Sequence, residues 1–389
     1  MVVADFFPLV LAVLILLSSF ISVKLSFSVS VIEIVLGIIA GNLGLLQPES
    51  WMVYIAGIGG MLLTFLAGTE IDFDIVRRNI KTCLGIGIGS FLISFIFVFL
   101  FAYYSFRWGF VASLLTATAL SETSIAIVYS VILDHGLSGK NMGTILMGST
   151  FIINVCTALT LSVLFMKQDI YTLIFIIASV VILAFAYKFS DVLFESKTFS
   201  MQRNEIEIKY VILLIILLMF FATLGGGQAL LPVFLLGALL SKPFSENNKN
   251  NMIERLQIVV FSVITPIFFI IGGTKVSIPI ILSAFSLFIA LFAVRQVAKF
   301  IGAYPVIRRA LSRNQIYITL ILSTGLTFGL VAALYGETNN LITTTEYSII
   351  TGVLILSAII PTIIGDRFYA PSEEDLYDDE KELISENEG

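Results

Sequence analysis

Residues 116–124 read Thr116-Ala117-Thr118-Ala119-Leu120-Ser121-Glu122-Thr123-Ser124 and lie at the centre of the apolar run 108–133. A run of this length can cross the hydrocarbon core of a bilayer, which needs about 20 apolar residues. Its centre, however, is small, polar and poorly helical, and it carries a carboxylate. A carboxylate at such depth is costly unless it faces a cavity or a partner, so the segment indicates a functional site.

A second interrupted segment lies in the later apolar run 313–336, where the central residues read Ser323-Thr324-Gly325-Leu326-Thr327-Phe328-Gly329. Small residues also mark close helix packing in membrane bundles, and packing is the simpler explanation for either segment taken alone. A matching pair of interrupted helices in inverted repeats is typical of secondary transporters. The pair, with a glutamate in one member, therefore favours a transporter with a crossover at Ser323, Thr324 and Gly325.

The composition places both segments in a membrane. The 389 residues are 58% hydrophobic and 13% charged, with a mean hydropathy of +1.01. Soluble domains carry about a quarter charged residues. The two cysteines, Cys83 and Cys156, lie in apolar runs and provide neither a disulfide framework nor a cysteine metal site. The sequence thus predicts an all-α polytopic membrane protein.

Apolar runs bounded by glycine, proline and charged residues predict about thirteen transmembrane helices. They lie at residues 6–23, 29–46, 51–70, 80–103, 108–133, 141–166, 170–189, 208–225, 228–242, 257–274, 278–303, 313–336 and 345–364. With the N-terminus outside, 17 of the 22 Lys and Arg residues fall on the cytoplasmic side and three fall outside. We therefore expect a multi-pass protein of the cell membrane, with its N-terminus outside and its C-terminus in the cytoplasm.

The two interrupted runs are the fifth and twelfth of these helices, so they are separated by an offset of seven. Because seven is odd, helices one to six and eight to thirteen form two six-helix blocks of opposite orientation. We predict two inverted six-helix repeats with broken crossing helices, within a transmembrane domain at 1–368. Residues 369–389 follow as an acidic tail, and the nine acids and one lysine of 373–389 predict that this tail is disordered and cytoplasmic.

Four further motifs resemble those of the monovalent cation/proton antiporter 2 family, which has the sodium/proton-exchanger fold. In the family's order, they span Glu33–Gly41, Phe65–Asp72, Phe234–Ser241 and Thr265–Gly272. The resemblance implies exchange of Na+ or K+ for protons by alternating access, in the bilayer, without a cofactor and without nucleic acid. It also implies a homodimer in which core helices, at about 80–166 and 278–364, move against a scaffold formed by the rest.

The family carries an Asp-Asp or Asn-Asp pair in its sixth helix, which aligns here with Ile153 and Asn154. Asparagine keeps a coordinating carbonyl oxygen but cannot exchange a proton near neutral pH. We therefore predict that Glu122 has taken over this role, and that a monovalent cation binds at Glu122 and Asn154. The alternative is a structural glutamate held by backbone N–H groups or by a buried lysine.

Other polar residues are candidate ligands of the cation. Thr150 and Thr157 share a helical face with Asn154, and this stripe suits ion coordination or interhelical hydrogen bonding about equally. Thr118, Ser121, Thr123 and Ser124 offer the hard oxygen ligands that Na+ and K+ prefer.

Lys299 and Arg295 are candidate charge partners of the site. The segment Ala298-Lys299-Phe300-Ile301-Gly302 resembles the family's eleventh-helix motif, in which a lysine pairs with the core carboxylate. Lys299 lies about eight residues to the cytoplasmic side of the predicted span centre, so a lysine that snorkels to the interface is the alternative. Arg295, one turn deeper, is a rival counter-ion.

Three further titratable residues are assigned structural roles. Glu33 and Glu70 lie near predicted cytoplasmic helix ends, where capping or pairing with Arg77 and Arg78 is expected. His135, the only histidine, is expected to be a solvated loop residue, with pH sensing as the alternative.

Competing functions follow from the same residues. No His-Glu-x-x-His motif and no nucleophile–histidine pairing appear in the sequence, which argues against an intramembrane enzyme. A non-transporting sensor, a channel-like relative and an organic-anion symporter on a similar scaffold remain as alternatives to cation/proton exchange.

Overall fold

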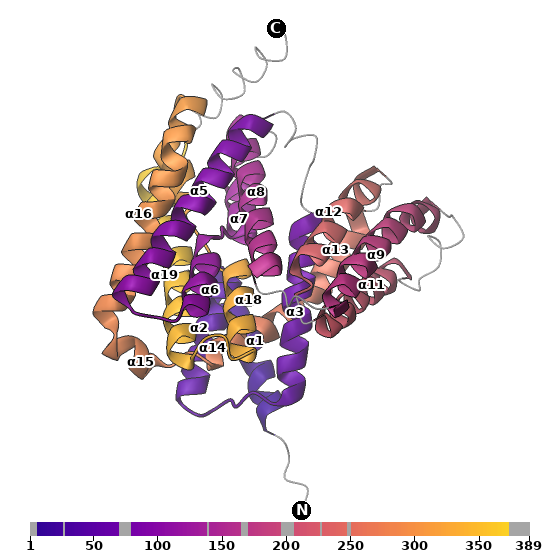
Figure 1. The fold of residues 1–389 in the computed structure, drawn as a ribbon, viewed down its shortest axis with the longest axis horizontal. Helices are drawn as coiled ribbons and strands as arrows, with labels where there is room; N and C mark the ends of the chain where they lie inside the picture. Colours follow the sequence, from indigo (N-terminus) through magenta and orange to yellow (C-terminus); the bar gives the residue numbers. More distant parts are fainter. Residues whose placement is uncertain are drawn as a thin grey trace, which may run out of the picture.

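The computed structural model describes residues 6–25, 28–69, 79–137, 140–164, 170–195, 206–225, 228–246 and 250–372. Within these ranges the chain is built from helices and contains no β-strand (Figure 1). Glu70, Arg77 and Arg78 lie outside the described residues, as do residues 373–389 of the tail 369–389 that was predicted to be disordered.

The helices follow the predicted apolar runs closely. They are α1 (Phe7–Leu25), α2 (Val29–Asn42), α3 (Ser50–Thr69), α5 (Ile80–Leu100), α6 (Phe110–Ser121), α7 (Ile125–Asp134), α8 (Asn141–Leu164), α9 (Ile170–Glu195), α11 (Ile206–Leu224), α12 (Leu230–Glu246), α13 (Asn250–Val259), α14 (Thr265–Thr274), α15 (Ile278–Ser283), α16 (Phe285–Ala310), α17 (Gln315–Leu322), α18 (Thr327–Thr338) and α19 (Thr344–Phe368). Wider π-helical turns at Phe101–Ser105 and Val260–Ile264 extend α5 and join α13 to α14.

Among the described residues, eleven helical segments are long and apolar enough to cross a membrane, and two shorter apolar helices lie at Val29–Asn42 and Leu230–Ser241. Every one of the thirteen predicted runs overlaps one of these segments. The number of actual crossings and the inverted repeat stay predictions.

The two interrupted segments lie at the centre of the bundle. In an apolar stretch of 18 residues within the segment that contains α6 and α7, 83% of the residues are buried, and in the equivalent stretch of the segment that contains α17 and α18, 94% are buried. The corresponding values for α1, α9 and α11 are 17%, 22% and 28%. Figure 1 shows α9 and α11 at one edge of the molecule. Apolar side chains on these helices are therefore exposed at the surface of the chain, as a membrane-spanning bundle requires.

Both predicted interruptions are breaks in the helices. The chain leaves the helical conformation between Ser121 and Ile125, where Glu122 is extended at φ −70° and ψ 169°. It leaves it again between Leu322 and Thr327. The Ser124 N–H donates to the Thr324 carbonyl oxygen at 3.4 Å, so the two breaks lie against each other.

The predicted helix at 278–303 is wrong in its limits. The structure has a short helix, α15, a non-helical Ala284, and then α16, which continues through Pro305 to Ala310. Because α16 begins and ends later than predicted, Lys299 lies near its middle. The predicted displacement of Lys299 from the centre of its span was therefore wrong.

Two of the four family-like motifs meet along α2 and α14, and the other two meet along α3 and α12. A Cβ on Gly37 would lie 2.2 Å from the Ile270 carbonyl oxygen, and one on Gly273 would lie 2.3 Å from that of Ile34. Gly68 and Gly237 make the same reciprocal contact between α3 and α12. These glycines let backbones approach closely where the bilayer provides no hydrophobic force between helices. The motifs thus shape the bundle around the breaks.

Candidate functional site

The site begins with two helix ends that carry partial negative charge. α6 and α17 both stop at the breaks, where the C-terminal end of each helix carries partial negative charge. Arg295 of α16, which is fully buried, lies against both ends. Its Nε donates to the Leu120 carbonyl oxygen at 2.8 Å, its Nη1 to that of Ser323, and its Nη2 to that of Glu122 at 3.3 Å. The guanidinium therefore caps two interrupted helices at once.

Lys299, one turn along α16, binds the same crossover. Its Nζ donates to the Ser121 carbonyl oxygen at 2.7 Å and to Thr123 Oγ1 at 3.1 Å. The Thr123 hydroxyl in turn donates to the Leu322 carbonyl oxygen at 2.6 Å. Lys299 is only 1% exposed and its ammonium points into the bundle, so the snorkelling alternative is wrong.

The Glu122 carboxylate is completely buried, and neither of its oxygens has a hydrogen-bond partner of good geometry. It lies beside the Arg295 guanidinium at Gly325, because a Cβ on Gly325 would be 2.3 Å from Arg295 Nη2 and 3.1 Å from Glu122 Oε1. The backbone N–H groups of Leu326, immediately before α18, and Gly329, in its first turn, also lie near the carboxylate.

Positive charge near Glu122 therefore favours its ionised form without forming a direct ion pair with it. The N-terminus of α18 carries partial positive charge, and two buried bases lie nearby. Among the contacts of the described residues, neither Arg295 nor Lys299 forms a direct ion pair with this carboxylate, because both donate to backbone carbonyls and to the side chains of Gln296 and Thr123. The structure thus leaves the Glu122 oxygens available to a proton or a small cation.

Asn154 of α8 reaches the same break. Its Nδ2 donates to the Thr123 carbonyl oxygen at 3.0 Å, and its Oδ1 has no partner. Ser124 Oγ is likewise buried without a partner. Asn154 therefore contacts the peptide next to Glu122, as expected if the two residues serve one site, and it contributes a free neutral oxygen.

The hydroxyl groups proposed as ligands are mostly occupied as donors within their own helices. Thr150 donates to the Leu146 carbonyl oxygen at 2.8 Å, and Thr157 to that of Ile153 at 3.0 Å. The interhelical hydrogen bonds that the polar stripe suggested are therefore absent at these two positions. Donation to a carbonyl oxygen three or four residues earlier in the chain is also seen for the hydroxyls of Thr118, Ser121, Ser323 and Thr324. Among the described residues, neither Thr118 nor Thr150 forms a hydrogen bond with Glu122.

One residue of the crossover was missed from the sequence. Ser357 of α19 donates to the Gly325 carbonyl oxygen at 3.0 Å and so helps to hold the second break in place. A single serine in an apolar run carries no distinguishing signal, because most such hydroxyls bond to their own helix.

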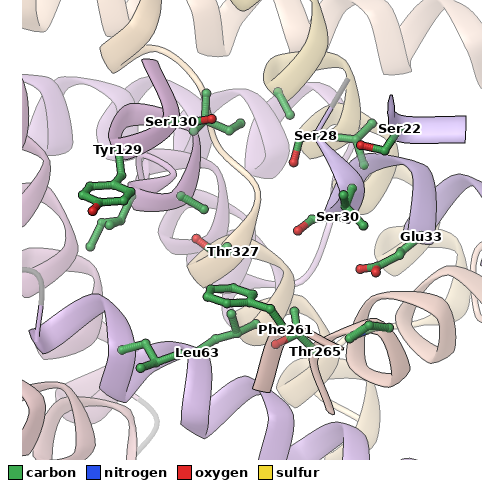
Figure 2. A pocket seen from close by; sticks show the side chains of 18 of the residues that line it. Ser22, Ser28, Ser30, Glu33, Leu63, Tyr129, Ser130, Phe261, Thr265 and Thr327 are labelled. Atoms are coloured by element: carbon green, nitrogen blue, oxygen red, sulfur yellow. The ribbon is translucent and has the colours of Figure 1, made fainter. Parts of the chain in front are cut away.

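A cavity of about 1040 Å³ leads to the breaks (Figure 2). It reaches Ile125 and Thr327, the first residues of α7 and α18, and extends to His135 and Asp366. His135 lies in the turn after α7 and its side chain is partly exposed, and its Nε2 lies 3.1 Å from Asp366 Oδ1. In the predicted orientation this end of the cavity is cytoplasmic.

We also compared the described residues with the clusters of side chains that hold metal ions in proteins. In the part of the chain that the structure describes, no group of three or more His, Cys, Asp or Glu side chains could hold a metal ion. A monovalent cation does not require such a cluster, because one carboxylate and several neutral oxygens suit it.

Comparison with known proteins places the chain among transporters. Residues 9–367 match the family described as sodium/hydrogen exchanger, transmembrane. The protein named "Probable Na(+)/H(+) antiporter 3" from Methanocaldococcus jannaschii is 26% identical over 86% of this chain and 88% of its own length. The Na(+)/H(+) antiporter of Enterococcus hirae is 21% identical over 86% of this chain and 90% of its own length.

A solved structure supports the same fold. The sodium proton antiporter MjNhaP1 from Methanocaldococcus jannaschii, at pH 8, superimposes with a TM-score of 0.70 at 17% identity, over 93% of this chain and 97% of that one. The predicted resemblance to sodium/proton exchangers is therefore confirmed. With its match over residues 9–367 and its two broken helices around a buried glutamate, this chain belongs to the sodium/hydrogen exchanger family.

Proposed function

We propose that this protein exchanges a monovalent cation, Na+ or K+, for protons by alternating access, and that Glu122 carries each in turn. One observation carries the proposal. Glu122 lies fully buried in the break of a membrane helix, and neither of its carboxylate oxygens has a hydrogen-bond partner of good geometry. A buried carboxylate in that position needs a proton or a cation.

Competition between these two occupants is the basis of exchange. Burial disfavours the ionised carboxylate, whereas nearby positive charge favours it. A bound proton and a bound Na+ or K+ each neutralise Glu122, so they exclude one another at a single site. Arg295 and Lys299 are held by backbone carbonyls, which keeps them close enough to favour ionisation without replacing the cation.

Neutral oxygens complete the proposed cation site. Asn154 Oδ1 and Ser124 Oγ are buried and unpartnered, and Asn154 is bonded to the break itself. They are the strongest candidates as ligands beside Glu122. The hydroxyls of Thr118, Ser121, Thr123 and Thr150 are secondary candidates, because each already donates to a backbone carbonyl.

The cavity suggests how ions from one side of the membrane reach the site at the breaks. Its walls come from α1, α2, α3 and α14 on one side and from α7, α18 and α19 on the other. The first group belongs to the proposed scaffold and the second to the proposed core at about 80–166 and 278–364. Movement of the core against a homodimeric scaffold would close this cavity and open a path to the opposite face.

Purified protein in sealed proteoliposomes tests the proposal. An imposed Na+ or K+ gradient should drive a change of internal pH, followed with an enclosed pH-sensitive dye. A non-transporting sensor would give no change, a channel-like relative would pass cation current without proton movement, and an organic-anion symporter would require the anion. Each of these three results would contradict exchange.

A further inference from the structure

A second buried carboxylate lies in the cavity, away from the breaks. Glu33 of α2 is 2% exposed and lines the cavity wall. Figure 2 shows its carboxylate turned toward the interior, with Ser30 of the same helix nearby and Thr265 of α14 on the adjoining wall. Glu122 is not among the lining residues, so the two carboxylates occupy separate places along one route.

The structure contradicts the capping role expected for Glu33. α2 begins at Val29, and no acidic residue lies in its first turn. Glu33 is the fifth residue of the helix, where the backbone N–H groups already have helical partners. The bases proposed to pair with it, Arg77 and Arg78, lie outside the described residues.

Among the described residues, the surroundings of Glu33 supply oxygen atoms and neither lysine nor arginine. Of the described residues that line the cavity, Glu33 and Asp366 are acidic and none is lysine or arginine. The Ser18 hydroxyl of α1 is in hydrogen-bond contact with the Glu33 carboxyl. Thr265 also lines the cavity, is 2% exposed, and has an Oγ1 without a hydrogen-bond partner.

We propose that Glu33 and Thr265 form a second binding site for a monovalent cation, in the wall of the cavity that leads to Glu122. A nearly enclosed carboxylate that has no lysine or arginine beside it among the described residues is costly unless a positive charge compensates it. An acidic cavity with low-dielectric walls concentrates cations, and the Thr265 hydroxyl offers a free, hard oxygen. The identity of the cation rests on the proposed exchange, but binding at Glu33 does not require a functional Glu122.

The site has a directional consequence. Glu33 lines the same cavity as His135 and Asp366. A cation that enters the cavity can therefore bind at Glu33 before it reaches Glu122, so the site loads cations from the side to which the cavity opens. In the predicted orientation this is the cytoplasmic side. Loss of Glu33 should therefore raise the apparent KM for Na+ added to the cytoplasmic face and leave the maximal rate near that of the wild type.

Equilibrium binding of 22Na+ to purified full-length protein tests the site without depending on transport. We expect two ions per wild-type chain, one for Glu33→Gln, one for Glu122→Gln and none for the double variant. Glu49→Gln is the matched control, because Glu49 lies in the segment before α3 and accepts a hydrogen bond from Trp51 Nε1, which glutamine also accepts. It should bind two ions.

Thr265→Val provides a second, more conservative variant that keeps the shape of the side chain. It should weaken binding at the Glu33 site about tenfold, which corresponds to loss of one interaction with a charged group. This variant decides the question if Glu33→Gln fails to fold. Everted membrane vesicles, with Na+ added to their exposed cytoplasmic face, supply the KM measurement.

Two ions bound by Glu33→Gln, or an unchanged Na+ affinity in Thr265→Val, would overturn the proposal. A lowered maximal rate with an unchanged KM in Glu33→Gln would do the same. Undiminished 22Na+ binding by Glu122→Gln would instead refute the role of Glu122 and leave the Glu33 site standing. The failures of the two proposals are thus distinguishable.

Discussion

Replacement of Arg295 by methionine should destabilise the protein more than any comparable change in α16. Arg295 donates to three buried carbonyl oxygens, at Leu120, Glu122 and Ser323. A buried acceptor left without a donor costs about 1–3 kcal/mol. Arg295→Met leaves three such carbonyl oxygens, so it should lower the free energy of unfolding by about 3–9 kcal/mol. Removal of a buried charge recovers part of its desolvation cost, which makes the upper end a limit.

Lys299→Met provides the internal comparison. It leaves one carbonyl, that of Ser121, without its donor, because Thr123 retains its bond to Leu322. The same arithmetic gives about 1–3 kcal/mol. Arg309→Met is the matched control, since Arg309 is exposed in the last turn of the same helix, and it should unfold with the wild type.

Thermal unfolding in detergent, followed by intrinsic fluorescence, ranks the stabilities of the three variants. Arg309→Met should match the wild type, Lys299→Met should have a lower Tm, and Arg295→Met the lowest. If Arg295→Met unfolded at or above the Tm of Lys299→Met, the capping of two helix ends by one guanidinium would be refuted.

Further variants test the geometry of the breaks by the proteoliposome assay. Asn154→Asp should move the transport optimum to higher pH, because two neighbouring carboxylates resist ionising together; an unchanged pH profile would argue that Asn154 and Glu122 do not share a site. Glu122→Gln combined with Asn154→Asp should partly restore exchange relative to Glu122→Gln, and failure of the folded double variant would count against the same idea. Gly325→Ala should abolish exchange, because its Cβ would lie 2.3 Å from Arg295 Nη2. Gly57→Ala, where no atom lies within 4 Å, should exchange normally, and equal activity of the two alanine variants would refute the crowding argument.

Much of the fold was predictable because the bilayer limits the alternatives. Apolar runs must become helices, since only helices and closed barrels satisfy the backbone in hydrocarbon. The segments around Glu122 and Gly325 stood out because they combine small and polar residues at the centre of such runs. The breaks at both places follow from that composition.

Tertiary features were less accessible to sequence reasoning. Lys299 was placed too far from the centre of its span, because nothing in the apolar pattern separates α15 from α16 at Ala284. The contact of His135 with Asp366 joins residues far apart in sequence, and no local pattern indicates it. The position of Glu33 in a cavity depends likewise on how α1, α2 and α14 pack.

Glu122→Gln is the most direct test of the account, because glutamine keeps the shape of the side chain and removes the exchangeable proton. In sealed proteoliposomes, the folded variant should show no proton movement under a Na+ or K+ gradient that drives exchange in the wild type. Exchange at the wild-type rate in Glu122→Gln would contradict the central role of this residue.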